Sequence, residues 1–330
     1  MMRLPRLAAA LRPLVRPALG LVVFVAIGVA CVYAVAGSYG LNIVLHRGGT
    51  LWVPVAANDP RLSSSMRLAL HNRSIAATPG GFAWRSIGPG FEVAELPVTA
   101  NGATVDQILL ARVDPARFRF VVRTAPAGNR NLDEWMAALN AALVINGSYF
   151  TRDGTPDTPL VSGGVALGPK TYLAKHGAFV ASATFVGVHD LAKEDWHTLL
   201  RGADDAMVSF PMLVTADGAS RVNADWQRLA NRSFVGQDRS GRIVLGTTTD
   251  AFFALDRFAD FLAKAPLDLA LALNLDGGPV ASQGIALNGY RRDYCGQWEL
   301  AARGGRMRLL ASIIGTRCWE MPIVLAVLPK

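Results

Sequence analysis

The sequence has few of the residues and motifs that many enzyme classes require. Its 330 residues include only three cysteines and five histidines, and the cysteines lack the clustered spacing of a zinc site. A Gly-x-Ser-x-Gly elbow, a phosphate-cradling Walker loop and a dinucleotide-binding glycine pattern are also missing. We therefore exclude a serine hydrolase of that type, a Walker-type nucleotide enzyme and a dinucleotide-dependent enzyme, and we expect no organic cofactor.

Dense basic runs are missing as well, although the formal net charge is +8. Arg3, Arg6, Arg12 and Arg16 supply four of the 33 basic residues, so 29 face 25 acidic ones in the rest of the chain, a net charge of +4. Nucleic-acid-binding domains carry clustered Lys and Arg residues with interleaved aromatics. The rest of the chain lacks this pattern, so we predict no nucleic-acid partner, and anionic envelope polymers remain candidates.

One long apolar run is present near the N-terminus. Residues 18–36 carry no charge and are almost wholly apolar. This length is enough for a helix to cross a bilayer, and flanking arginines favour the cytoplasmic side. A cleaved signal peptide is the alternative, because Ala34-Val35-Ala36 has the small-x-small pattern of a cleavage site. In either case we expect the remainder to lie outside the cytoplasm, in a periplasmic or extracellular position.

Composition and turn signals divide the chain into four predicted segments. These are a basic cytoplasmic N-terminus at 1–17, a transmembrane anchor or signal sequence at 18–38, a juxtamembrane linker at 39–80 and a main domain at 81–330. The linker contains several breakers, and we expect a short helix over 62–70. In an exported domain Cys295 and Cys318 can form a disulfide, but the sequence leaves two free thiols equally open.

The main domain is predicted to be rich in strands. Alternating apolar and polar residues over 104–113 and 118–123, joined by a turn at Asp114-Pro115, indicate a hairpin. We expect a helix that begins at Asn131 and runs through Leu139, with a capping box between Asn131 and Glu134, and an amphipathic helix over 250–264. This order predicts an α+β fold, a mixed β-sheet core with a few crossover helices, preceded by one N-terminal transmembrane helix. Further strands are expected over 161–167, 178–188, 207–215, 233–238 and 243–247.

Two apolar strands end in similar polar clusters. Residues 142–145 are followed by Asn146-Gly147-Ser148-Tyr149-Phe150, and residues 269–273 by Asn274-Leu275-Asp276-Gly277-Gly278-Pro279. Such a tip presents an amide or a carboxylate, and its glycines can take positive φ and expose backbone N–H groups. The alternative is ordinary turn chemistry, in which the aspartate accepts hydrogen bonds from its own loop.

These two clusters resemble the signatures of the phosphodiester glycosidase family. INGSYF at 145–150 is similar to the family's INGGFF motif, and LNLDGG at 273–278 to its LNLDGG motif. The resemblance extends from about Trp84 to about Ile285. Ser148 and Pro279 stand where the family has glycines, and Val280-Ala281 replaces its usual Ser-Ser. The resemblance implies that residues 81–330 form a domain that hydrolyses sugar phosphodiesters.

The two tips and the resemblance give three candidate catalytic residues. Asp276 is the candidate general base or the residue that binds sugar hydroxyls. The Asn146 amide is expected to bind a hydroxyl or a phosphate oxygen, and the Arg232 guanidinium to bind a phosphate through two parallel hydrogen bonds. Their alternatives are turn capping, a bond to backbone and a solvated surface side chain, respectively. The further candidate substrate-binding residues are Gly147, Ser148, Tyr149, Phe150, Asp153, His176, Asn274, Gly277 and Gly278.

Two other groups of side chains have more than one interpretation. Asp153 and Asp157 share one loop and either supply a general acid, bind a hard cation or are solvated. We predict no metal site, and dependence on a divalent cation stays open. Tyr149, Trp226 and Trp298 either stack on a sugar ring or pack in the core.

We predict an exported, membrane-anchored phosphodiester glycosidase acting on cell-envelope or exopolysaccharide glycans or on their lipid-linked precursor. The alternative is a non-catalytic glycan-binding or polysaccharide-assembly factor with the same pocket. Neighbouring parallel strands would bring both tips to one sheet edge, where ligands bind. We then expect the side chains of Asn146 and Asp276 to lie within about 10 Å of each other, in an open polar pocket.

Overall fold

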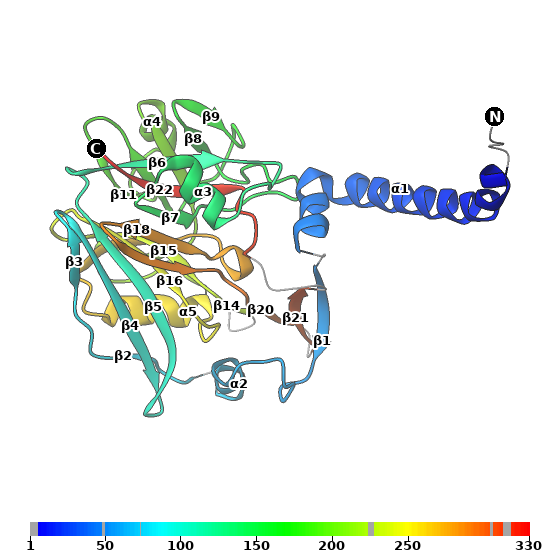
Figure 1. Ribbon diagram of the computed structural model, residues 1–330. Helices are drawn as coiled ribbons and strands as arrows, with labels where there is room; N and C mark the ends of the chain where they lie inside the picture. The colour runs from blue at the N-terminus through cyan, green and yellow to red at the C-terminus, as the bar shows by residue number, and fades with distance from the viewer. Residues whose placement is uncertain (1–5, 48–49, 73, 224–227, 304–305, 313–317) are drawn as a thin grey trace.

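A long helix projects from a β-rich body (Figure 1). The computed structural model describes residues 6–47, 50–72, 74–223, 228–303, 306–312 and 318–330, so Arg3 lies outside the described residues. The projecting helix is α1 (Arg6–Arg47). Four shorter helices, each between six and ten residues long, lie on the body. They are α2 (Ser64–His71), α3 (Leu132–Leu139), α4 (Trp196–Arg201) and α5 (Leu255–Lys264). The predicted α+β class is confirmed.

The body is built from four β-sheets, whose strands pair antiparallel in the described residues. The largest runs in the order β13 (Met212–Val214), β17 (Leu269–Asn274), β15 (Ser233–Asp238), β16 (Ile243–Thr248), β5 (Ala103–Val113), β4 (Phe91–Ala100) and β2 (Thr78–Pro79), with β3 (Arg85–Gly88) paired to β4. The second runs β19 (Tyr290–Tyr294), β18 (Gln283–Leu287), β7 (Leu143–Asn146), β22 (Ile323–Pro329) and β6 (Phe118–Thr124).

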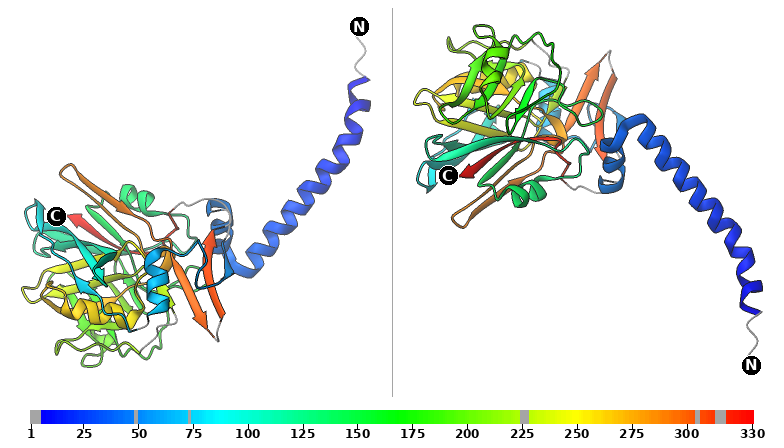
Figure 2. Two further views of the ribbon diagram at one scale, coloured as in Figure 1. Left: turned by 90° about the horizontal axis from the view of Figure 1, so that it is seen from below. Right: turned by 90° about the horizontal axis from the view of Figure 1, so that it is seen from above.

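The two smaller sheets flank these. One runs β11 (Val186–Asp190), β10 (Gly177–Ala181), β12 (Asp205–Ser209), β8 (Leu160–Ser162) and β9 (Val165–Leu167). The other runs β1 (Thr50–Val55), β21 (Arg306–Ser312), β20 (Glu299–Arg303) and β14 (Arg228–Ala230). Figure 2 shows this last sheet at the side of the body where α1 leaves it.

A shared apolar layer explains why strands of different sheets end near one another. Ile145 of β7, Leu273 of β17 and Phe179 of β10 belong to one buried cluster. Burial of each such side chain contributes about 1.5–3 kcal/mol. The layer packs β7 against β17 although each strand pairs within its own sheet.

The predicted hairpin over 104–113 and 118–123 is wrong, although both strands exist. β5 pairs with β4 and β16, whereas β6 pairs with β22. The turn is real, since the carbonyl of Asp114 accepts from the N–H groups of Arg117 and Phe118. It carries the chain from one sheet to another because the C-terminal strand β22 lies beside β6 in the second sheet.

Three expected strands are each divided in two, and the expected helix is shorter. Residues 161–167 and 178–188 lie in the hairpins β8–β9 and β10–β11, and residues 207–215 in β12 and β13. The helix expected over 250–264 begins at Leu255, because residues 251–254 form a buried, non-helical approach. The strands expected over 233–238 and 243–247 are confirmed, and they pair as the hairpin of β15 and β16.

The segment expected as a linker packs on the body. β1 pairs with β21, and α2, capped by the hydroxyl of Ser63, buries Met66 in the core. The expected helix is therefore confirmed, while the segment boundaries at 38 and 80 stay predictions. Cys295 and Cys318 form a disulfide, which decides between the two states that the sequence left open.

Candidate functional site

The two polar strand tips meet. Asn146 donates from Nδ2 to the backbone carbonyl of Asp276 at 2.8 Å, and the Asp276 N–H donates to the carbonyl of Gly147 at 3.0 Å. The expected proximity is confirmed, but the expected route to it is wrong. β7 and β17 belong to different sheets, and packing across the shared apolar layer brings their ends together.

The β7 tip uses its polar groups to hold the structure together. Asn146 is buried, and its Oδ1 also accepts from the Ser282 N–H at 3.3 Å. Ser148 is buried and accepts from the hydroxyl of Thr158 at 3.2 Å. A Cβ on Gly147 would lie 2.4 Å from Cγ2 of Ile323, so only glycine fits there. These contacts support the backbone-bonding alternative for Asn146.

Tyr149 and Asn274 join the two tips below the surface. The Tyr149 hydroxyl donates to the carbonyl of Phe210 at 2.7 Å and accepts from Asn274 Nδ2 at 2.7 Å. The Tyr149 ring also stacks on the ring of Phe210, with centroids 4.3 Å apart. Burial, and next the charge of Asp276, raise the pKa of Tyr149. The hydroxyl is therefore neutral and acts as a hydrogen-bonding strut.

Asp276 differs from the residues around it because its carboxyl group titrates near neutrality. Burial raises its pKa to about 7. The Gly277 N–H, which donates to Oδ1 at 2.8 Å, opposes this rise, the charge of Glu299 adds to it, and Arg228 and Arg232 oppose it. The side chain stays partly exposed. A partly accessible carboxyl group poised near pH 7 can exchange a proton with a ligand.

Arg232 is neither a surface side chain nor an open phosphate fork. The residue is 4% exposed, and its guanidinium donates to the carbonyls of Phe253 at 3.2 Å and Arg228 at 2.7 Å. A Cβ on Gly277 would lie 3.4 Å from its Nη1. Arg232 therefore lies beneath the Asp276 tip and supports it.

Glu299 and Arg228 belong to the site but were missed from the sequence. The Glu299 carboxylate packs on Gly278, where a Cβ would lie 2.8 Å from its Oε2, and burial raises its pKa. Arg228 pairs with it at 3.6 Å, and the Arg228 side chain is 58% exposed. No local pattern marks either residue, because β14 and β20 reach the tip only through the tertiary fold.

Asn231 fixes the strand that carries Glu299. Its Oδ1 accepts from the N–H groups of Gln297 and Trp298 at 3.0 and 2.9 Å. Its backbone carbonyl accepts from the Gly278 N–H at 2.9 Å. One buried asparagine thus sets the position of Glu299 relative to the Asp276 tip.

The expectation that Gly277 and Gly278 expose N–H groups to an anion is wrong. The Gly277 N–H donates to Asp276 Oδ1 and the Gly278 N–H to the carbonyl of Asn231. Gly278 does need its glycine, since its φ is 71° and Glu299 leaves no room for a Cβ. At this tip, side chains rather than backbone N–H groups are therefore available to bind an anion.

The remaining candidates lie around the edge of this site. Phe150 packs its ring against Tyr39 of α1, and Asp153 packs against Gly37. The His176 ring lies next to the Phe210 ring, with centroids 6.1 Å apart. Trp298 packs against the apolar core and Trp226 lies outside the described residues.

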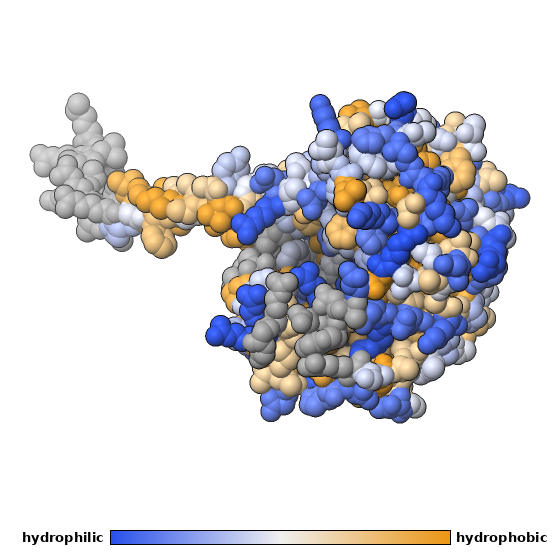
Figure 3. Space-filling model, turned by 180° about the vertical axis from the view of Figure 1, so that it is seen from behind, coloured by the Kyte–Doolittle hydropathy of each residue, from blue (hydrophilic) through white to orange (hydrophobic). Residues whose placement is uncertain are grey.

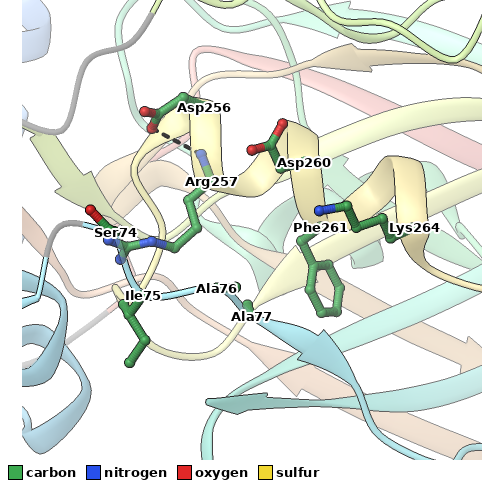
Figure 4. Close-up of a pocket in the computed structure, with 9 residues that line it drawn as sticks. All are labelled: Ser74, Ile75, Ala76, Ala77, Asp256, Arg257, Asp260, Phe261 and Lys264. Atoms are coloured by element: carbon green, nitrogen blue, oxygen red, sulfur yellow. Dashed lines mark hydrogen bonds between the residues drawn. The ribbon is translucent and has the colours of Figure 1, made fainter. Parts of the chain in front are cut away.

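The cavities in the described part of the chain include three of about 190, 320 and 490 Å³, and Asp276 lines none of these three. The smallest lies between α5 and residues 74–77, toward which Arg257 and Phe261 point (Figure 4). The open polar pocket at the tips stays a prediction. Within the described ranges, no group of three His, Cys, Asp or Glu side chains is arranged to hold a metal ion.

A solved structure shows the same fold. The catalytic domain of zebrafish N-acetylglucosamine-1-phosphodiester alpha-N-acetylglucosaminidase, auto-inhibited by its pro-peptide, matches with a TM-score of 0.53 at 17% identity, over 79% of this chain and 91% of that chain. A hypothetical protein from Synechocystis matches with a TM-score of 0.47 at 14% identity, over 78% of this chain and 68% of its own. No curated protein matches the sequence.

The sequence profile of one family covers both strand tips and the strands that complete the site. The profile of the phosphodiester glycosidases matches residues 139–303, which is half of the chain. This range runs from the end of α3 through β7 and β17 to the end of β20, so it includes Asn146, Arg228, Asp276 and Glu299. The chain belongs to the phosphodiester glycosidase family.

Proposed function

We propose that the chain hydrolyses glycosyl-1-phosphodiester bonds at the Asp276 site. The observation that carries this proposal is the group at the β17 tip: a carboxyl with a pKa of about 7, Glu299 beside it and the exposed guanidinium of Arg228. Carboxylates are the groups that glycosidases use at an anomeric carbon. An arginine fork suits a phosphate leaving group.

The proposed reaction uses Asp276 in its carboxylate form. Asp276 accepts a proton from water as the water oxygen bonds to the anomeric carbon. The bond from that carbon to the phosphate oxygen breaks, and the phosphate monoester leaves with the electron pair. Asp276 then returns the proton to solvent. Arg228 stabilises the leaving anion, which is the point where such preorganised charge accelerates a reaction.

The remaining predicted residues have supporting roles in this proposal. Glu299 keeps the pKa of Asp276 high, Arg232 supports the tip, and Asn146 holds the two tips together. We further propose that the chain is exported and anchored through α1, so that the site faces cell-envelope or exopolysaccharide glycans outside the cytoplasm. The 26-residue apolar span Pro17–Asn42 supports this placement.

Hydrolysis of a chromogenic sugar-1-phosphodiester by the detergent-solubilised full chain tests the proposal. Wild-type protein should release the phosphate monoester, and Asp276→Asn should release it roughly 10² to 10³ times more slowly. A control for folding is needed, and a single cooperative melting transition of Asp276→Asn, at a temperature no lower than that of wild-type protein, supplies it. Failure of wild-type protein to cleave a panel of sugar phosphodiesters would reject the catalytic proposal.

A non-catalytic glycan-binding protein is the second candidate. The observation that favours it is that the Asn146 amide and the N–H groups of Gly277 and Gly278 already donate hydrogen bonds within the protein. Fewer donors remain for the transition state than the motifs suggested. Saturable binding of a sugar phosphodiester without turnover, lost in Asp276→Asn, would identify this second function.

A further inference from the structure

The helix α1 bends where a membrane would end. Residues 17–36 stand clear of the body and form an apolar rod (Figure 3). Gly37 then takes φ 63° and ψ −164°, which breaks the helix. A helix needs about 20 apolar residues to cross the hydrocarbon core, and residues 17–36 supply that length. The bend therefore falls at the outer membrane surface when α1 spans the bilayer.

The residues after the bend, 37–42, form a docking segment that is fixed to the body. Tyr39 is 9% exposed, and its ring meets that of Phe150 edge to face, with centroids 5.1 Å apart. Asn42 donates from Nδ2 to the carbonyl of Ala127. A Cβ on Gly37 would lie 2.8 Å from Oδ1 of Asp153. These contacts hold the body in one orientation relative to α1.

The docking segment lies beside the candidate site. Phe150, which packs on Tyr39, directly follows Tyr149, and consecutive Cα atoms lie about 3.8 Å apart. The Tyr149 hydroxyl in turn bonds Asn274 of the Asp276 tip. One loop therefore connects the point of membrane exit to the carboxyl group proposed to act.

A second connection between α1 and the candidate site runs through β1. β1 follows α1 and is the edge strand of the sheet β1–β21–β20–β14. β20 begins with Glu299 and β14 with Arg228. Strands lie about 4.8 Å apart, and this narrow sheet lies on the α1 side of the body (Figures 1 and 2). Trp52 of β1 and Arg308 of β21 also pair here, with the guanidinium 5.7 Å from the ring centroid, and tryptophan favours membrane interfaces.

We propose that the substrate is a membrane-inserted lipid whose head group is a glycosyl phosphodiester. This inference rests on the proposed function and narrows its substrate class. A site held next to the membrane surface meets head groups of lipids in the same bilayer at high effective concentration. A water-soluble polymer gains nothing from this arrangement.

Two substrates with the same sugar phosphate test the inference. One carries a long acyl or polyprenyl chain and the other a methyl ester, and both are offered to the full chain reconstituted in phosphatidylcholine vesicles. Wild-type protein should cleave the lipid substrate at least about tenfold faster at equal concentration. Tyr39→Ala with Asn42→Ala should lower that ratio while methyl-ester hydrolysis stays unchanged.

Matched variants separate docking from general damage to α1. Tyr33 is 57% exposed on the apolar rod, so Tyr33→Ala should keep the ratio. Tyr39→Phe retains the ring contact and should keep it too. Equal ratios in wild-type protein and the Tyr39 Asn42 double variant would overturn the inference and leave the proposed function standing. Cleavage of neither substrate would instead reject the proposed function.

Discussion

The two strand tips look alike in sequence but do different work. At the β7 tip Asn146 donates from Nδ2 to the Asp276 carbonyl and accepts at Oδ1 from the Ser282 N–H, and Ser148 is buried against Thr158. At the β17 tip Asp276 keeps a partly exposed carboxyl group with a pKa of about 7. The first tip is a scaffold, and the second carries the group that can exchange a proton.

This difference shows that residue type at a strand end does not assign a role. The role depends on how many of that side chain's hydrogen-bonding groups already have partners within the fold. A buried amide with both atoms bonded stabilises the fold, because leaving its partners unpaired costs free energy. A carboxyl group whose charged form is penalised by burial is held ready to take a proton.

Asp276→Asn should have the largest effect on activity. Losing a charge that acts in the transition state costs roughly 10² to 10³ in rate. The measurement is kcat/KM with a sugar phosphodiester. Asp268→Asn is the matched control, because Asp268 is exposed and its φ of 54° suits asparagine. Equal activity of Asp276→Asn and wild-type protein would place the chemistry elsewhere.

The same substitution should raise stability at alkaline pH. The folded-state pKa of Asp276 is about 7, above an unfolded value of about 3.9. Between these values the folded state holds a proton that the unfolded state has lost, so stability falls as pH rises from about 4 to 7. Because asparagine does not titrate, Asp276→Asn should raise the free energy of unfolding by up to about 4 kcal/mol at pH 8 and change it little at pH 4. Denaturant titrations at both pH values check the sign.

Asn146→Ala should be the largest stability change at the scaffold tip. It leaves the Asp276 carbonyl and the Ser282 N–H without their partner, at a cost of about 2–3 kcal/mol. Urea unfolding measures this, with Asn129→Ala as the control because Asn129 is exposed. A stable Asn146→Ala that has lost only activity would move Asn146 from scaffold to catalysis.

The two arginines extend the comparison. Arg232→Ala removes hydrogen bonds to two backbone carbonyls and should cost about 2 kcal/mol of stability. Arg228→Ala removes an exposed side chain and should leave stability within about 0.5 kcal/mol. It should lower kcat/KM roughly tenfold through the lost phosphate contact. The reverse pattern, with Arg228→Ala unfolding and Arg232→Ala inactive but stable, would restore Arg232 as the phosphate fork.

The sequence predicted the tips and their meeting but not the way the sheets bring them together. The apolar runs before Asn146 and Asp276 identify buried strands, because such runs have few other uses. The turn at Asp114 looks the same whether the next strand returns to its own sheet or enters another, so the hairpin prediction failed. Glu299 has no local signal, since its position depends on the bonds that Asn231 makes to Trp298 and Gly278.

The smallest expected effect, on the pH dependence of kcat/KM, tests the charges around Asp276. If its carboxylate is the active form, the rate should rise through a midpoint near the pKa of about 7. The charge of Glu299 raises that pKa and the charge of Arg228 lowers it. Glu299→Gln should therefore move the midpoint to lower pH, and Arg228→Gln should move it to higher pH. Each shift should be less than about one pH unit, or about 1.4 kcal/mol. The two substitutions control for each other, because each removes one charge but the expected shifts have opposite signs. A loss of packing would move both midpoints without regard to the sign of the charge removed. Two shifts in one direction would show that another group sets the profile, and Asp276 would then be, like Asn146, part of the scaffold.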